Sequence, residues 1–346
     1  MSTTSIARNP SAPPRGLHRF ATVLACLVVL LIAAGALVKS KEAGLSVPDW
    51  PLSYGSFSPP HWWRIDTVRA EHGHRLFAGT IALLTVALAV WTTRVERRAW
   101  VRRVAWSAVG AVVAQALLGG ITVLLFLPPA VSIAHAGLAE LFLCLVVTVA
   151  VATSNSFGEA TLAQIPLTGS SVAAVRALAT ATTAFVYLQI LLGAVMRHNG
   201  AGLAIPTFPL AWGRLVPARF TFAIAIHYAH RVGALVVALA VLTTATAVLR
   251  RHRGERTLAL PALAMVGIVA VQISLGALVV LTRRAVLPNT VHVATGASLL
   301  ATSLVLTLQS WRLARGQTSA VGTKAEATVE AGAPRRTLEA AREALS

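Results

Sequence analysis

Eight long apolar runs divide this chain of 346 residues. Each run reaches the roughly 20 residues that a helix needs to cross a ~30 Å hydrocarbon core. Only 12% of the residues are charged, about half the ~25% of an ordinary soluble domain. We therefore predict an all-α polytopic membrane protein with eight transmembrane helices. The predicted helices cover residues 19–38, 70–93, 103–127, 131–152, 173–196, 219–249, 257–281 and 288–311.

The net charge of +18 reflects where the basic residues stand along the chain. Most Lys and Arg residues outside the apolar runs fall on the side that holds both chain ends, and the opposite loops hold fewer. The positive-inside rule places the richer side in the cytoplasm, so both termini are predicted to be cytoplasmic. Because the basicity follows the topology, we expect no nucleic-acid partner.

An internal repeat relates the two halves of the chain. After the first run stands G-A-L-V-K-S-K-E-A-G-L-S-V-P-D-W-P-L (35–52), and after the fifth stands G-A-V-M-R-H-N-G-A-G-L-A-I-P-T-F-P-L (193–210). Similarly, Q-A-L-L-G-G-I-T-V (115–123) matches Q-I-S-L-G-A-L-V-V (272–280). Apolar composition alone does not produce aligned G-L-x-x-P-x-x-P-L loops, so we interpret the repeat as structural.

Each repeat contains four helices, so both halves enter the membrane from the same side. This relates them by an axis along the membrane normal, as two pseudo-symmetric four-helix bundles. The predicted organisation is a cytoplasmic tail at 1–18, a first half at 19–155, a second half at 172–312 and a mobile cytoplasmic tail at 313–346, which is polar.

Four histidines follow the repeat. His74 corresponds to His230, and His135 corresponds to His292, so each half carries one histidine on its second helix and one on its fourth. An ionisable side chain inside a bilayer is costly and indicates a functional site. Two imidazoles on facing helices are a standard axial pair for a heme iron. We therefore predict one bis-histidine heme site in each half, towards the extracytoplasmic side.

The two halves differ beside these histidines. Glu71 stands one turn before the first-half histidine, where the second half has His227. Glu71 is the candidate catalytic acid, with an ion pair to Arg75 as the alternative role. His227 is a candidate second-shell donor or alternative ligand. Arg75 and Arg231 directly follow the ligand histidines and either bind heme propionates or reach the lipid headgroups.

The remaining intramembrane candidates are weaker. His72 is two residues from His74, so it points about 200° away around the helix. Glu140 is a second acid within an apolar run, but it lies away from the ligand face of its helix. Four further histidines stand in predicted tails or loops and are expected to be solvated. They are His18, His61, His198 and His252.

Several motifs together resemble the heme A synthase family, over about residues 17 to 312. They are E-x-x-H-R (71–75), Q-x-x-L-G-G-x-T-V (115–123), G-L-x-x-P-D-W-P-L (44–52) and H-V-A-T-G (292–296). The resemblance implies an oxidoreductase acting on the C8 methyl group of heme O, which becomes the formyl group of heme A for terminal oxidase assembly.

The resemblance also implies a role for each site residue. His230 and His292 would bind the iron of a heme b cofactor, and His74 and His135 would flank the substrate heme. Glu71 matches the functionally important acid of the family. The residues themselves leave two other functions open. These are a di-heme b-type cytochrome for electron transfer, and a heme carrier or assembly factor.

One family feature is missing, and it affects the route of the electrons. Many members carry two cysteines around the P-D-W-P-L loop, whereas the cysteines here are Cys26 and Cys144, both within apolar runs. No thiol in that loop is therefore available to this chain for redox chemistry or heme transfer. The expected partners are heme O and the lipid bilayer of the plasma (inner) membrane. Further candidates are a heme O synthase, an electron acceptor and a second copy of the chain.

Overall fold

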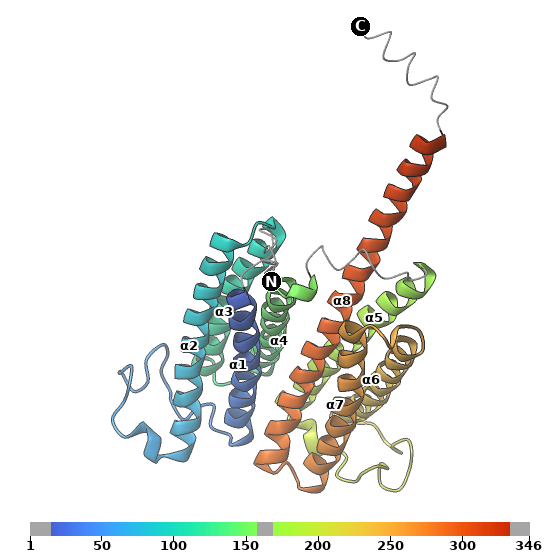
Figure 1. Cartoon of the computed structure of the whole chain (residues 1–346). Coiled ribbons are helices and arrows are strands. Elements are labelled where there is room, and N and C mark those ends of the chain that lie inside the picture. The colour runs from blue at the N-terminus through green and yellow to red at the C-terminus, as the bar shows by residue number, and fades with distance from the viewer. Residues whose placement is uncertain (1–14, 158–168, 333–346) are drawn as a thin grey trace, which may run out of the picture.

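The computed structural model describes residues 15–157 and 169–332, and it is helical throughout apart from loops and two isolated β-bridges in that part of the chain (Figure 1). Eight of its helices are long and apolar enough to cross a membrane, as predicted. These are α1 (Arg15–Ser40), α2 (Asp66–Val95), α3 (Ala99–Leu124), α4 (Pro129–Ala152), α5 (Gly169–His198), α6 (Phe222–His252), α7 (Arg256–Leu281) and α8 (Val286–Gly332).

Local sequence signals explain several helix ends. Pro129 opens α4, where its missing N–H leaves no intrahelical bond unmade. Side chains cap two other helices, since Thr221 accepts a hydrogen bond from the Ile224 N–H and Glu255 accepts one from the Thr257 N–H.

The last helix differs most from the expectation. α8 continues to Gly332, well past its predicted end at residue 311. Residues 333–346 and 1–14 lie outside the described residues. The mobility of the tail and its cytoplasmic location stay predictions.

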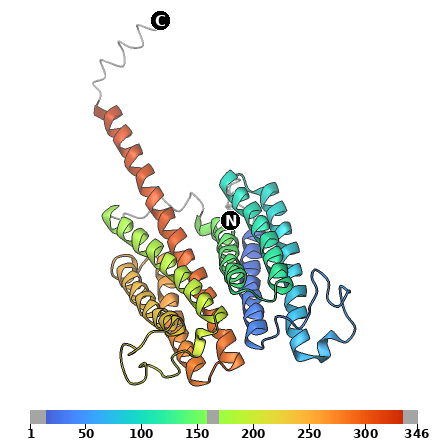
Figure 2. The same cartoon turned by 180° about the vertical axis from the view of Figure 1, so that it is seen from behind.

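The helices form two neighbouring groups, α1–α4 and α5–α8 (Figures 1 and 2). Each group has its own apolar core, one centred on Leu24, Ile81 and Leu143 and the other on Met265 and Leu300. The groups meet where α8 packs on α1 and α4 and where α5 packs on α4. Each group therefore encloses its own pair of candidate histidines.

Polar contacts join the two groups near the long loops. Arg197 of α5 donates to the Ala36 carbonyl at 2.8 Å and to the Ser40 hydroxyl at 2.9 Å, both on α1. Asn289 of α8 donates to the same hydroxyl at 3.1 Å. The repeat counterpart of Arg197 is Lys39, which lies close enough to Arg197 to repel it. Hydrogen bonds between the groups therefore lie beside two cations that occupy matching repeat positions.

The two long loops, 41–65 and 199–221, lie at the same end of the molecule (Figure 1). They share a tight turn, and in both loops a cis X–Pro bond precedes it. The matching features are bridges Ser53↔Ser56 and Ala211↔Arg214, positive φ at Tyr54–Gly55 and Trp212–Gly213, and cis bonds Trp50–Pro51 and Phe208–Pro209. The sequence repeat therefore extends to the loop backbone, while the axis relating whole halves stays a prediction.

The two turns are closed by different side chains at one repeat position. The Asp49 carboxylate accepts hydrogen bonds from the N–H groups of Tyr54 and Gly55, each at 2.7 Å. In the second loop, the Thr207 hydroxyl accepts from the Trp212 N–H at 2.9 Å. The Gly55 N–H, with that of Tyr54, holds the pKa of Asp49 below its ordinary value of 3.8.

This exchange of caps predicts how the first turn responds to substitution and acid. Asp49→Leu should remove the hydrogen bonds that close the turn. Asp49→Thr should retain such a bond, because Thr207 closes the turn of the second loop with its hydroxyl. Since the folded pKa is lowered, the contribution of the carboxylate is complete above pH 3.8 and is lost as the pH falls through the lowered value. Hydrogen–deuterium exchange of the Tyr54 and Gly55 amides, corrected for intrinsic rates, measures both effects. We expect several-fold faster exchange in Asp49→Leu, and wild-type protection of these amides would contradict this role of Asp49.

Candidate functional site

The four predicted histidines lie in two pairs, one in each helix group. His74 of α2 is close enough to His135 of α4 to interact with it electrostatically. His230 of α6 and His292 of α8 are related in the same way. All four stand in the part of their helices nearest the long loops. The structure therefore brings together the residues that the repeat paired.

A glycine on the preceding helix makes room for each imidazole. A Cβ atom at that glycine would meet the Cε1 atom of the histidine ring at a distance that real Cβ atoms rarely show. A Cβ at any of these positions would require the ring to move by a few tenths of an ångström, so glycine favours this close approach of ring and backbone. The contacts are Gly35–His74 at 3.1 Å, Gly119–His135 at 3.1 Å, Gly193–His230 at 3.0 Å and Gly276–His292 at 3.2 Å.

These four residues fit the ligand set of a heme. The Nδ1 atoms of His74, His135 and His292 are buried and have no hydrogen-bond partner among the described residues. A buried imidazole without a partner is costly unless a ligand engages the ring. In the same part of the chain, no group of three or more His, Cys, Asp or Glu side chains gathers to hold a metal ion. Two facing imidazoles instead suit an iron already held by a macrocycle.

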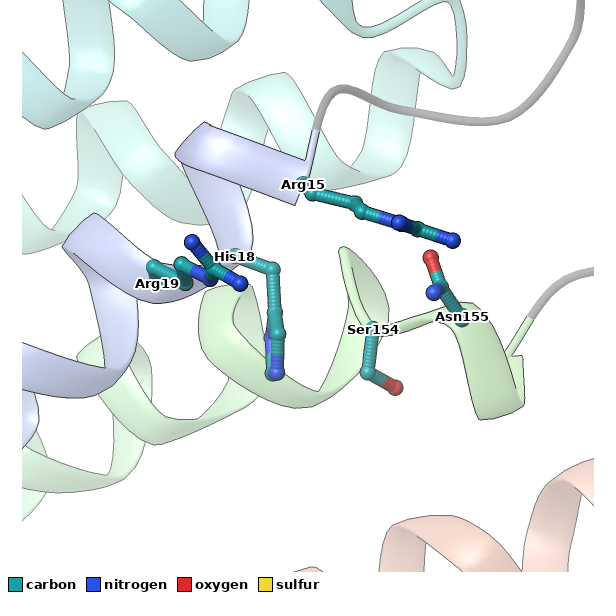
Figure 3. A pocket seen from close by; sticks show the side chains of 5 residues that line it. All are labelled: Arg15, His18, Arg19, Ser154 and Asn155. Carbon is teal, nitrogen blue, oxygen red and sulfur yellow. The ribbon is translucent and has the colours of Figure 1, made fainter.

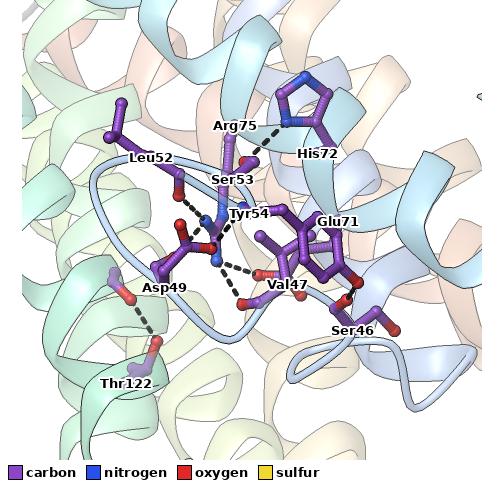
Figure 4. A network of polar contacts seen from close by, with 11 residues as sticks. Ser46, Val47, Asp49, Leu52, Ser53, Tyr54, Glu71, His72, Arg75 and Thr122 are labelled. Carbon is purple, nitrogen blue, oxygen red and sulfur yellow. Dashed lines mark hydrogen bonds and ion pairs between the residues drawn. The ribbon is translucent and has the colours of Figure 1, made fainter. Parts of the chain in front are cut away.

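Glu71 is buried, with 5% of its surface exposed, and its two oxygens differ (Figure 4). Oε1 accepts from Arg75 Nη2 at 2.8 Å, so the ion pair weighed as an alternative is present. Oε2 is buried without a partner among the described residues. The ion pair therefore orients the carboxylate and leaves one oxygen available for chemistry.

Both arginines that follow the ligand histidines hold the long loops in place. Arg75 and Arg231 each donate to three backbone carbonyls of their own loop, which Figure 4 shows for Arg75. The acceptors are Asp49 (2.7 Å), Leu52 (3.0 Å) and Val47 (3.0 Å) for Arg75, and Ile205 (2.8 Å), Thr207 (2.7 Å) and Pro209 (3.4 Å) for Arg231. This loop-bracing role was not expected from the sequence, and contact with propionates stays a prediction.

His72 and His227 also serve the loops. His72 Nδ1 lies 2.8 Å from the Ser53 hydroxyl (Figure 4). His227 is buried, and its Nδ1 lies 3.2 Å from the Ala201 carbonyl and 3.3 Å from the Ile205 N–H. The residue that replaces Glu71 in the second half therefore holds backbone.

The histidines expected to be solvated behave differently from one another. His61 is exposed, but His252 is only 4% exposed at the end of α6, so its predicted solvation is wrong. His18 Nδ1 lies 2.8 Å from the Ala150 carbonyl. His198 is half-buried at the end of α5. His18, His198 and His252 all lie within helices that extend further than predicted.

A pocket at the beginning of α1 is a separate feature (Figure 3). It is lined by Arg15, His18, Arg19, Ser154 and Asn155. These residues lie where α1 begins and just after α4 ends, at the opposite end of both helices from Gly35 and His135. This pocket is therefore not part of the histidine site.

The fold and site together define a polytopic membrane protein with one histidine pair in each helix group, one of which has a buried acid beside it. Residues 67–304 match the sequence model of the COX15-CtaA family, described as cytochrome oxidase assembly protein. The chain belongs to this family.

Individual relatives agree with that assignment. A heme A synthase of Symbiobacterium thermophilum is 32% identical over 64% of this chain and 72% of its own length. One of Shouchella clausii is 30% identical over 79% of this chain and 89% of its own. One of Alkalihalophilus pseudofirmus is 27% identical over 80% of this chain and 90% of its own length. Similarity therefore extends over most of the membrane region.

The glycine contacts predict a selective loss of bound heme. Gly119→Ala and Gly276→Ala should push the facing histidine away and lower the heme content of the affected half several-fold. Absorption spectra of the purified full chain measure this content.

Each variant has a matched control on its own helix. Gly110→Ala on α3 and Gly267→Ala on α7 place the new methyl group where no atom lies within 4 Å in the described structure. Both controls should keep wild-type spectra. Equal loss of heme in controls and test variants would show that the glycines matter for the helices in general and not for the ligands.

Proposed function

We propose that this chain is a heme A synthase that oxidises the C8 methyl group of heme O to a formyl group. The observation that carries the proposal is the free, buried Oε2 of Glu71, which lies one turn from His74 and has no acidic counterpart in the second half. Relatives that bear the name heme A synthase over most of their length support the same reaction.

The asymmetry assigns the two sites. Heme O lies between His74 and His135, where Glu71 is available, and a resident heme b is held by His230 and His292. When bound, heme b supplies one-electron transfer. The second half needs no acid for that task, and its His227 is already engaged with loop backbone.

The chemistry explains why an acid is needed at one site only. If water supplies the oxygen atom of the formyl group, conversion of the methyl group releases four protons and four electrons. The electrons pass to a separate electron acceptor. Dioxygen is the alternative source of the oxygen atom. Glu71 Oε2 accepts protons released at the substrate, while Arg75 keeps the carboxylate oriented through Oε1.

The first loop closes over the substrate half. The Trp50 ring packs against Gly120, beside the Gly119 that supports His135, and a Cβ at Gly120 would lie 2.5 Å from the ring. The second half has Ala277 at the position of Gly120. There Phe208, the counterpart of Trp50, lies under Arg231 at 5.8 Å. The deeper aromatic cover supports the first half as the site that excludes water during the reaction.

The cellular setting follows from the same proposal. The reaction takes place in the plasma membrane, which the bacterial relatives and the eight apolar helices support. The distribution of Lys and Arg supports cytoplasmic termini and heme sites towards the extracytoplasmic side. Heme O, drawn from a heme O synthase, reaches the site through the bilayer. An electron acceptor and a second copy of the chain complete the set of proposed partners.

Conversion in cells tests the proposal and the role of the acid. The full chain, co-expressed with a source of heme O, should yield extractable heme A, and Glu71→Gln should reduce it at least a hundredfold while the heme b spectrum persists. Glu140→Gln is the matched control, because Glu140 is also buried with an unpartnered oxygen and should be dispensable. Heme B alone, with no heme A from the wild type, would identify a di-heme cytochrome or carrier instead.

A further inference from the structure

The pocket at the beginning of α1 contains two arginines without a counter-ion (Figure 3). Arg15 and Arg19 stand about one turn apart on α1, and neither guanidinium has a hydrogen bond or an ion pair within the described part of the chain. The pocket has a volume of about 380 Å³, within the ~300–1,000 Å³ of ligand sites. Two cations that share one pocket repel each other, and a bound anion relieves that repulsion.

Two helices build the walls of this pocket. His18 Nδ1 lies 2.8 Å from the Ala150 carbonyl of α4, and because a carbonyl only accepts, Nδ1 is the donor. Ser154 and Asn155 follow the end of α4 and line the opposite side, and the Arg15 side chain extends towards Asn155 (Figure 3). The pocket is therefore held open by a contact between α1 and α4.

The acid that follows α2 is already neutralised by its own partner. Glu96 is buried, and its two oxygens accept from Arg98 Nε at 2.9 Å and from Arg98 Nη2 at 2.7 Å. The same guanidinium donates to the Ala152 carbonyl at 2.7 Å, just before the pocket residues that follow α4. Glu96 is therefore not a counter-ion for the pocket, whose two arginines keep their charge for an anion from outside the chain.

The second half fills the corresponding place. The repeat relates Arg15, His18, Arg19 and Ser154 to Ala173, Arg176, Ala177 and Trp311. The same register pairs buried Leu17 with buried Val175. Arg176 lies 4.7 Å from the centre of the Trp311 ring, and Trp311 Nε1 donates to the Thr180 hydroxyl at 3.0 Å. Two arginines and a serine are thus exchanged together for two alanines and an indole that covers the one remaining cation.

Aromatic side chains indicate the depth of the pocket in the membrane. Trp91 packs beside it, since a Cβ at Gly16 would lie 3.3 Å from the indole and the ring of Phe20 lies 5.7 Å from it. Tryptophan gathers where the hydrocarbon core meets the lipid headgroups. By the predicted topology this end of α1 faces the inner leaflet, where basic pockets between helices bind anionic headgroups.

We propose that this pocket binds the phosphate group of an anionic phospholipid, which links the beginning of α1 to the end of α4. Arg15 and Arg19 donate charge-assisted hydrogen bonds to the phosphate oxygens, and the Asn155 amide adds a neutral donor. A free phosphate ion offers the same oxygens, but the acyl chains of a lipid keep its phosphate at this depth. The site lies away from both histidine pairs, so the proposal is independent of the reaction.

Lipid binding to the purified full chain, followed by native mass spectrometry, tests the proposal. The wild type should bind phosphatidylglycerol about tenfold more tightly than phosphatidylcholine, whose trimethylammonium group the arginines repel. Arg15→Ala/Arg19→Ala copies the two alanines of the second half and should lose this preference. Ser154→Trp keeps both charges but should weaken phosphatidylglycerol binding by a similar factor, because the indole fills the pocket as Trp311 does in the second half.

The matched control is Arg94→Ala/Arg97→Ala, which removes two exposed arginines near the end of α2, outside the pocket lining, and should keep the preference. Equal binding of both lipids by the wild type would overturn the proposal, and so would an unchanged preference in Arg15→Ala/Arg19→Ala, even if Ser154→Trp fails to fold. Inorganic phosphate that binds as tightly as phosphatidylglycerol would identify a site for a free anion and would also reject the lipid.

Discussion

An imidazole ring inside a helix bundle needs space beside a neighbouring backbone, and here that space comes from one glycine on the preceding helix. The Cβ distances of 3.0 to 3.2 Å at these glycines show how closely the helices approach each ring. Pairs α1–α2, α3–α4, α5–α6 and α7–α8 all pack together in the structure. The four-helix groups, the facing histidines and the loops that cover them depend on this close approach.

On this common frame the two halves differ by a few side chains with connected effects. Glu71 against His227 gives one half a free carboxylate oxygen. Gly120 lets the first loop insert Trp50, where the second half has an alanine. These differences support the proposal that the first half holds the substrate heme and the second half the resident heme.

The sequence predicted all eight helices and both histidine pairs, because hydropathy and repeat spacing depend on chain order alone. It did not reveal the role of Gly35, although this residue opens a repeated segment, since its contact with His74 arises only between packed helices. Arg75 was expected to contact a propionate, a lipid headgroup or Glu71. Its guanidinium also donates to loop carbonyls, which no sequence pattern marks. The burial of His252 was missed because the predicted α6 ended too early.

The central claim is that the two histidine pairs hold different hemes. Extraction of pigment from two single-site variants, His74→Ala and His230→Ala, each produced with a heme O source, tests it most directly. The account predicts that His74→Ala retains heme B alone, and that His230→Ala loses heme B while still binding heme O. The same mixture of pigments in both variants would contradict the assignment of one substrate site and one cofactor site.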